Sequence, residues 1–148
     1  MDDLSWHVRV RSTGRGRARA YARQHQFAVG EAVTFDVEHD LLAGLEYLLG
    51  ALGADLVTGL QRAARRRGAA LDQVEAVVSG WLDNPLAYLG VVGESGHPGL
   101  TRVVARVYVG ADEDGPALQA AWREALARSP FVGVLTRALE LDLSVSVV

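Results

Sequence analysis

The segment DLLAGLEYLLGALGADL, residues 40–56, says more about the architecture than any other part of the chain. From Asp40 to Arg67, leucines return at spacings of three and four residues, which is the period of an α-helix. Asp40 is a candidate N-cap, and Gly68 fits the C′ position after a basic last turn. The pattern predicts a long helix over 40–68. Its apolar surface runs nearly all round, so we expect it at the centre of the fold or of a dimer.

Glycines recur inside this predicted helix, at Gly44, Gly50, Gly53 and Gly59. Glycine lowers helix propensity by about 1 kcal/mol relative to alanine. Such glycines are expected where another backbone packs closely, or where the helix breaks. The sequence therefore predicts either close packing or a break near residues 50–53.

The segments on both sides of this helix have mainly β periodicity. Residues 1–37 contain three short alternating runs, the first placing Trp6, Val8 and Val10 on one face, and they predict an antiparallel meander of half-buried strands. Residues 71–148 predict two strands joined by a long glycine-rich connection, two helices and a last strand; the segments are 71–82, 100–109, 112–128, a short helix opened by Ser129-Pro130, and 139–148. The order predicts an α+β domain.

Length and composition describe one globular domain, residues 1–148. The 148 residues are 49% hydrophobic and carry a formal charge of −3, and a chain of this length buries enough surface to fold without disulfides. It has no cysteine, which excludes thiol chemistry and thiolate metal sites. No apolar run approaches 18 residues and the first residues are acidic, so we expect a cytoplasmic protein without a membrane partner.

The basic residues do not indicate a nucleic-acid partner. All 15 are arginines, and several alternate with small apolar residues in 9–23, which favours a solvated strand face on a chain that is acidic overall. The four histidines are scattered, with no pair at metal-binding helical spacing. We therefore expect no metal, no cofactor and no nucleic acid.

The order of elements resembles the OsmC/Ohr family over essentially the whole chain. Local motifs add to the resemblance: HQFAVGEAVTF (25–35), LEYLLGALGA (45–54), GESGHPG (93–99) and RSP (128–130). It implies an OsmC-like fold, with antiparallel sheets packed around a long central helix and two chains intertwined in a homodimer. Family members reduce organic hydroperoxides with a peroxidatic cysteine on the central helix and a resolving cysteine that opens a later helix.

Both cysteine positions differ in this chain. The family's Gly-Ala-Cys matches Gly53-Ala54-Asp55, and its Cys-Pro matches Ser129-Pro130. Peroxide reduction of this type needs a thiolate that is oxidised to a sulfenic acid and then resolved by a thiol, and neither aspartate nor serine can do this. The resemblance therefore implies the fold and a pocket, and we expect no thiol peroxidase activity.

Asp55 is the first candidate for other chemistry. A carboxyl group on an apolar helix face is desolvated and can exchange protons near neutrality, unless it simply pairs with an arginine. The family places an arginine and a glutamate beside its reactive cysteine; Arg15 resembles the first, and Glu46 approximates the second. Nine residues separate Glu46 from Asp55, which puts them on opposite sides of an unbroken helix. Only a helix break or a dimer partner would bring them together.

The remaining candidates are binding residues. A role as a helix N-cap is enough to explain Ser129. A nucleophilic serine needs a neighbouring base, and no sequence motif places a histidine beside Ser129. The family dimer forms an apolar cavity beside its central helices. We expect His25, Tyr47, Ser129 and Phe131 to contact a small hydrophobic ligand there, although hydrogen bonding within the fold is the simpler role for His25.

Three functions remain open. The first is a homodimer that binds a small apolar ligand, and the second is a non-redox enzyme of the cyclase, isomerase or hydrolase type with Asp55 as general acid or base and Arg15 stabilising negative charge. The third is a structural partner protein without a ligand.

Overall fold

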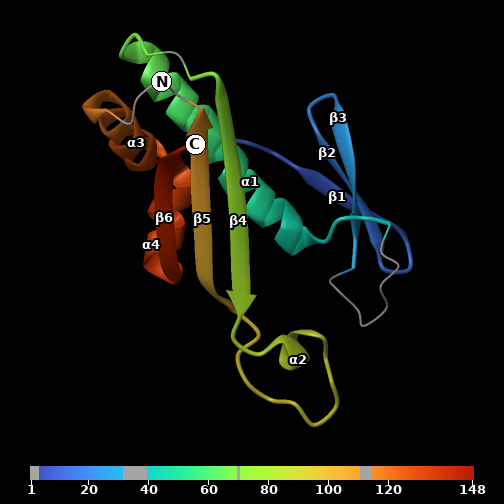
Figure 1. Cartoon of the computed structure of the whole chain (residues 1–148). Helices are drawn as coiled ribbons and strands as arrows, with labels where there is room; N and C mark the ends of the chain where they lie inside the picture. Colours follow the sequence, from blue (N-terminus) through green and yellow to red (C-terminus); the bar gives the residue numbers. More distant parts are fainter. Residues whose placement is uncertain (1–3, 32–39, 70, 111–114) are drawn as a thin grey trace. The chain divides into compact units, whose positions relative to one another are not determined.

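The computed structural model describes residues 4–31, 40–69, 71–110 and 115–148. Its contacts divide the chain into two units, 1–48 and 49–148, with the boundary inside the long helix α1. Figure 1 follows the order of the elements along the chain. They are β1 (Arg9–Gly14), β2 (Arg17–Ala22), β3 (His25–Gly30), α1 (Gly44–Arg66), β4 (Gln73–Leu82), α2 (Pro85–Tyr88), β5 (Leu100–Gly110), α3 (Pro116–Arg128), α4 (Pro130–Ala138) and β6 (Glu140–Val147).

The unit formed by residues 1–48 contains the antiparallel sheet β1-β2-β3, which confirms the predicted meander. The expected half-buried first strand is wrong. Trp6 and Val8 precede β1, both are exposed, and every residue of β1 is exposed as well. An alternating pattern predicts a strand, but it does not show that another part of the protein packs against the strand's apolar face. Residues 32–37 of the predicted third run lie outside the described residues.

The helix α1 is shorter at its start than predicted. It begins at Gly44, and Asp40 is not the N-cap, because its carboxylate binds Arg17 at 3.1 Å instead. Glu46 Oε2 accepts a hydrogen bond from the backbone amide of Ala43 at 2.7 Å, which satisfies a donor at the helix start. The predicted end is confirmed: Gly68 has φ +73° and donates to the carbonyl of Arg65, and the next amide, of Ala69, donates to Ala64.

The break expected near residues 50–53 does not occur, because α1 runs unbroken from Gly44 to Arg66. The alternative explanation, close packing, applies to Gly53. A Cβ at Gly53 would lie 3.2 Å from Cγ2 of Val78 in β4. Gly53 therefore lets the helix approach the sheet closely.

The core lies in the unit formed by residues 49–148. There β5 pairs with β4 antiparallel, as expected, but with β6 in parallel, so the expectation of purely antiparallel sheets is wrong for this sheet. One face of this sheet is covered by α1, α3 and α4 (Figure 1). Every second residue of β5 is buried against leucines of α1 and apolar residues of α3; the core comprises Val103, Ala105, Val107, Val109, Leu52, Leu56, Leu60, Leu118, Ala121, Trp122 and Ala125.

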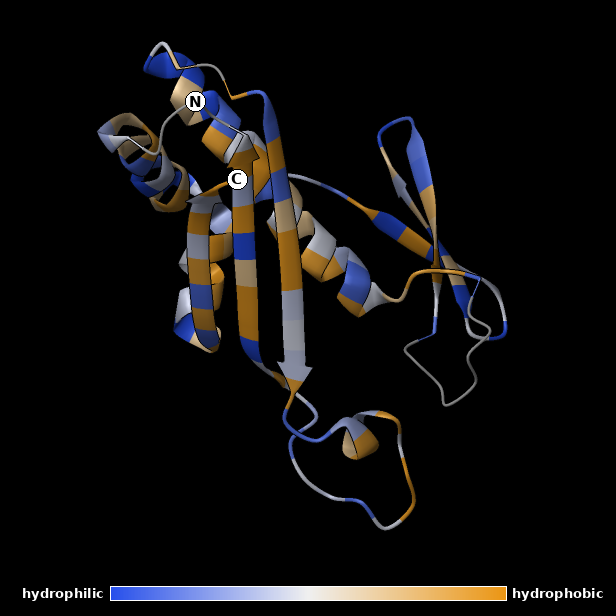
Figure 2. Cartoon of the chain, in the orientation of Figure 1, coloured by the Kyte–Doolittle hydropathy of each residue, from blue (hydrophilic) through white to orange (hydrophobic). Residues whose placement is uncertain are grey.

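The other face of the β4-β5-β6 sheet is partly apolar and exposed. Val77 and Trp81 project from β4 on this face, and β4 is also an edge strand. Figure 2 shows hydrophobic residues alternating with hydrophilic ones along these strands. Among the described residues, none of the helices is long and apolar enough to span a bilayer.

Candidate functional site

The side chains of Asp55 and Ser129 meet, although 74 residues separate them in the sequence. Asp55 comes from the middle of α1, and Ser129 lies between α3 and α4. The hydroxyl of Ser129 donates a hydrogen bond to Oδ2 of Asp55 at 2.5 Å, and its oxygen accepts one from the amide of Val132 at 3.0 Å. The predicted N-cap is therefore confirmed, and it has a second role as a link between helices.

The two partners differ in accessibility. Ser129 is 8% exposed, whereas Asp55 is half-buried. Within the described part of the chain, Oδ1 of Asp55 accepts no hydrogen bond. The expected pairing of Asp55 with an arginine is not observed among those residues. Asp55 therefore retains an acceptor oxygen that a ligand could use.

A small hollow of about 20 Å³ adjoins this pair, between α1 and α3. Its size suits one water molecule. Small residues at the crossing of the two helices leave this space, and arginines surround it; the lining residues are Asp55, Gly59, Arg62, Arg66, Ala125, Arg128 and Ser129. The hollow thus combines a carboxylate, a hydroxyl and guanidinium groups.

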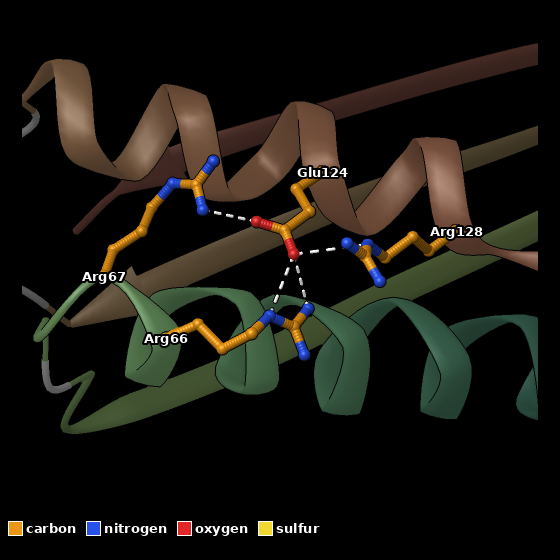
Figure 3. Close-up of polar contacts among 4 residues, drawn as sticks. All are labelled: Arg66, Arg67, Glu124 and Arg128. Atoms are coloured by element: carbon orange, nitrogen blue, oxygen red, sulfur yellow. Dashed lines mark hydrogen bonds and ion pairs between the residues drawn. The ribbon is translucent and has the colours of Figure 1, made fainter.

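Glu124 of α3 organises the arginines next to this hollow (Figure 3). Its Oε1 accepts hydrogen bonds from Nε and Nη2 of Arg66 at 2.9 and 2.6 Å and forms an ion pair with Nε of Arg128 at 3.3 Å. Its Oε2 accepts one from Nη1 of Arg67. The hydrogen bond from Arg66 lowers the pKa of Glu124, and the positive charges nearby lower it further, against a smaller opposing effect of burial.

Sequence reasoning missed this arginine cluster. Two signals were available: Arg62 and Arg66 are four residues apart in α1, and Glu124 and Arg128 are four residues apart in α3. Each spacing places two side chains on the same face of a helix. That these two faces oppose each other depends on how the helices pack, which the spacing does not reveal.

Four of the other predicted site residues, Arg15, Glu46, His25 and Tyr47, lie in the unit formed by residues 1–48. Arg15 is exposed in the turn between β1 and β2. The carboxylate of Glu46 is engaged at the start of α1, and because α1 is continuous, Glu46 and Asp55 project from opposite sides of it. Of the two ways considered for bringing them together, the helix break is absent and a dimer partner remains.

His25 and Tyr47 belong to the same unit. The hydroxyl of Tyr47 donates to the carbonyl of Ala28 at 2.7 Å, and its ring packs 4.8 Å from that of Phe27. His25 is exposed at the start of β3. Phe131 follows Ser129 in the other unit and packs partly against the core. Ligand contact by these residues stays a prediction.

A hollow of about 300 Å³ lies at the end of α1 and is lined by Gln61, Arg65, Ala69 and Leu71. Within the described ranges, no group of three or more histidine, aspartate or glutamate side chains is placed to bind a metal ion.

Comparison with known proteins places this geometry in a fold. The chain matches no protein-family model and none of the curated proteins. It is similar to the crystal structure of an OsmC-like protein from Mycoplasma pneumoniae, with a TM-score of 0.81 and 16% identity over 99% of both chains. It is also similar to an organic hydroperoxide resistance protein OsmC from Legionella pneumophila, with a TM-score of 0.72 and 13% identity over 99% of both chains.

A third similar structure is the organic hydroperoxide resistance protein OhrB of Bacillus subtilis. Its TM-score is 0.66 and its identity 15%, with 97% of this chain and 98% of that chain covered. These structures bear out the fold that the sequence resemblance implies. The chain therefore has the OsmC-like fold, in a sequence without cysteine.

Proposed function

We propose that the protein is a homodimer that binds a small, mainly apolar molecule beside Asp55 and Ser129 and does not reduce hydroperoxides. The observation that carries the proposal is the contact between these two side chains. The resemblance matches their positions to the family's two reactive cysteines, and here a carboxylate and a hydroxyl are joined by a hydrogen bond. Neither group can be oxidised and resolved as a thiol is.

Exposed apolar side chains support the homodimer. In the unit formed by residues 1–48, Trp6 is 84% exposed, and six other large apolar residues are accessible, namely Leu4, Val8, Val10, Phe27, Leu42 and Leu48. Globular monomers rarely leave large apolar patches in contact with water. In the other unit, β4 offers an exposed edge ten residues long, and unpaired strand edges favour association. The proposal is that a second copy of the chain packs against these apolar side chains and the edge of β4.

The ligand site needs only a few polar groups among apolar ones. Ser129 and the free oxygen of Asp55 supply hydrogen-bonding positions, and Phe131 lies two residues after Ser129 in the chain. Sites for small apolar molecules usually have this composition. His25 and Tyr47 are proposed as further ligand contacts.

Native mass spectrometry of the freshly purified protein tests the proposal. We expect twice the chain mass of 15.9 kDa, together with a small molecule that is lost under denaturing conditions. In a separate assay, tert-butyl hydroperoxide with a dithiol reductant should be consumed at the background rate. A monomer at micromolar concentration, or thiol-dependent turnover above background, would contradict the proposal.

A non-redox enzyme that uses Asp55 as general acid or base is the second candidate. The unoccupied Oδ1 of Asp55, beside the guanidinium groups of the hollow, is the observation that favours it. The variant Asp55→Asn separates the two functions. An enzyme would lose turnover and keep its ligand, whereas a binding protein would change only modestly in affinity.

A further inference from the structure

The hollow beside Ser129 holds more positive than negative charge. Three guanidinium groups, from Arg62, Arg66 and Arg128, line it or its rim, and the carboxylates within reach are those of Asp55 and Glu124. With Arg67, which also binds Glu124, the formal balance of this group is two positive charges, although the whole chain carries −3. One monoanionic group would offset half of this local excess.

The hydrogen-bond donors around the hollow exceed the acceptors. Glu124 uses both its oxygens on Arg66, Arg67 and Arg128. Arg128 contributes only its Nε to these contacts, and a guanidinium carries five N–H donors. Within the part of the chain that the structure describes, Arg62 has neither a hydrogen bond nor an ion pair. Arg62 and Arg128 thus offer free donors on two sides of the same hollow.

Guanidinium groups bind planar oxyanions particularly well. The fork of N–H groups matches the two oxygens of a carboxylate, and the pairing is stronger and more directional than with a lysine. A carboxylate carries a negative charge that offsets part of the local excess of positive charge. An uncharged amide of the same shape offers one acceptor oxygen and no charge.

We propose that the ligand carries a carboxylate, which Arg62 and Arg128 hold at the mouth of the hollow next to Ser129. The proposal rests on the proposed function, because Ser129 belongs to the proposed ligand site. The apolar part of the ligand would extend along α4, in whose middle Val134 is 66% exposed. The substrate class is therefore a small apolar carboxylic acid in its ionised form.

Benzoate and benzamide test the proposal as a pair, because they share shape and differ in charge. Affinities are measured by calorimetry or NMR titration on the full-length protein at fixed low ionic strength. We expect benzoate to bind the wild-type protein about tenfold more tightly than benzamide. Arg62→Gln and Arg128→Gln should each remove most of this preference, because they weaken the binding of benzoate much more than that of benzamide.

Arg137→Gln is the matched control, since Arg137 is an exposed arginine of α4 that does not line the hollow. It should leave both affinities unchanged. Equal binding of benzoate and benzamide would overturn the carboxylate site and leave the apolar ligand site standing. The same preference for benzoate in Arg62→Gln and Arg128→Gln as in the wild type would overturn the assignment of these arginines. Binding of neither probe would count against both proposals.

Discussion

The hydroxyl of Ser129 reaches the carboxylate of Asp55 at 2.5 Å and also caps α4 through the amide of Val132. One side chain thereby connects the middle of α1 to the start of α4. Ser129 is buried and Asp55 is half-buried, so loss of the hydroxyl would leave Oδ2 of a partly desolvated carboxylate without this partner, which is unfavourable.

Replacing Ser129 with alanine should therefore destabilise the protein more than loss of a cap alone. We expect Ser129→Ala to lower the free energy of unfolding by about 2 kcal/mol, from the lost cap and the unpaired Asp55. Urea denaturation measures the change. Thr136→Ala is the control, because the hydroxyl of Thr136 is exposed and bonds only within α4, to Val132. Equal effects of the two substitutions would contradict the double role of Ser129.

The proximity of the two side chains can be tested by covalent linkage. In the double variant Asp55→Cys/Ser129→Cys, the thiols should form a disulfide under mild oxidation, closing a loop across 74 residues. The chain-entropy model gives a stabilisation of about 4 kcal/mol for such a loop, and native-state strain would reduce it. Thiol titration of the denatured protein, before and after reduction, measures the linkage. The two single cysteine variants are controls, and two titratable thiols after oxidation would contradict the contact.

Local signals in the sequence predicted some of these features correctly. Ser129-Pro130 indicated a capped helix and Gly68 a helix end, because both depend on residues within one turn. Distant contacts were harder to predict. Asp40 looked like an N-cap but binds Arg17, which is 23 residues away. The glycines of α1 left open a break or close packing near residues 50–53, and only the structure shows that Gly53 is packed closely against Val78, on a later strand.

The candidate site was predictable only in part. Asp55 and Ser129 were singled out through the family resemblance, and no periodicity in the chain joins them. The cluster around Glu124 needed the packing of α1 against α3, which pattern analysis does not provide. Trp6 illustrates the same limit, because its alternation with Val8 suggested a buried face and both side chains are exposed.

Glu124 should make stability depend on pH. Its pKa is lowered by Arg66 and the neighbouring arginines, so its contribution is complete above the ordinary pKa of a glutamate and is lost as pH falls through the lowered value. Glu124→Gln should lower Tm at neutral pH, and its difference from wild type should vanish in acid. Thermal unfolding across pH measures this. Glu140→Gln is the control, because its ion pair with Arg102 is largely exposed and a smaller effect is expected.

Two glycines of α1 should respond oppositely to alanine. At Gly50 a Cβ meets nothing within 4 Å, so Gly50→Ala should stabilise the helix by about 0.5–1 kcal/mol. At Gly53 the added Cβ would press on Val78, so Gly53→Ala should gain less or destabilise. Chemical denaturation of both variants measures the difference. If both variants were stabilised equally, the packing of α1 against β4 around Gly53 would have to leave more space than the structure shows.

The proposed homodimer makes Trp6 a sensitive position. Its side chain is 84% exposed in the single chain, so its replacement by serine should leave the chain's own fold intact and remove apolar surface from the proposed interface. We expect Trp6→Ser to shift the dimer toward the 15.9 kDa monomer on dilution, measured by sedimentation or light scattering over a range of concentrations. Val148→Ser, at another exposed apolar residue, is the control and should leave the mass unchanged. If Trp6→Ser and the wild type dissociate at the same concentration, Trp6 does not contribute to the interface, and the apolar surface of residues 4–10 needs another explanation.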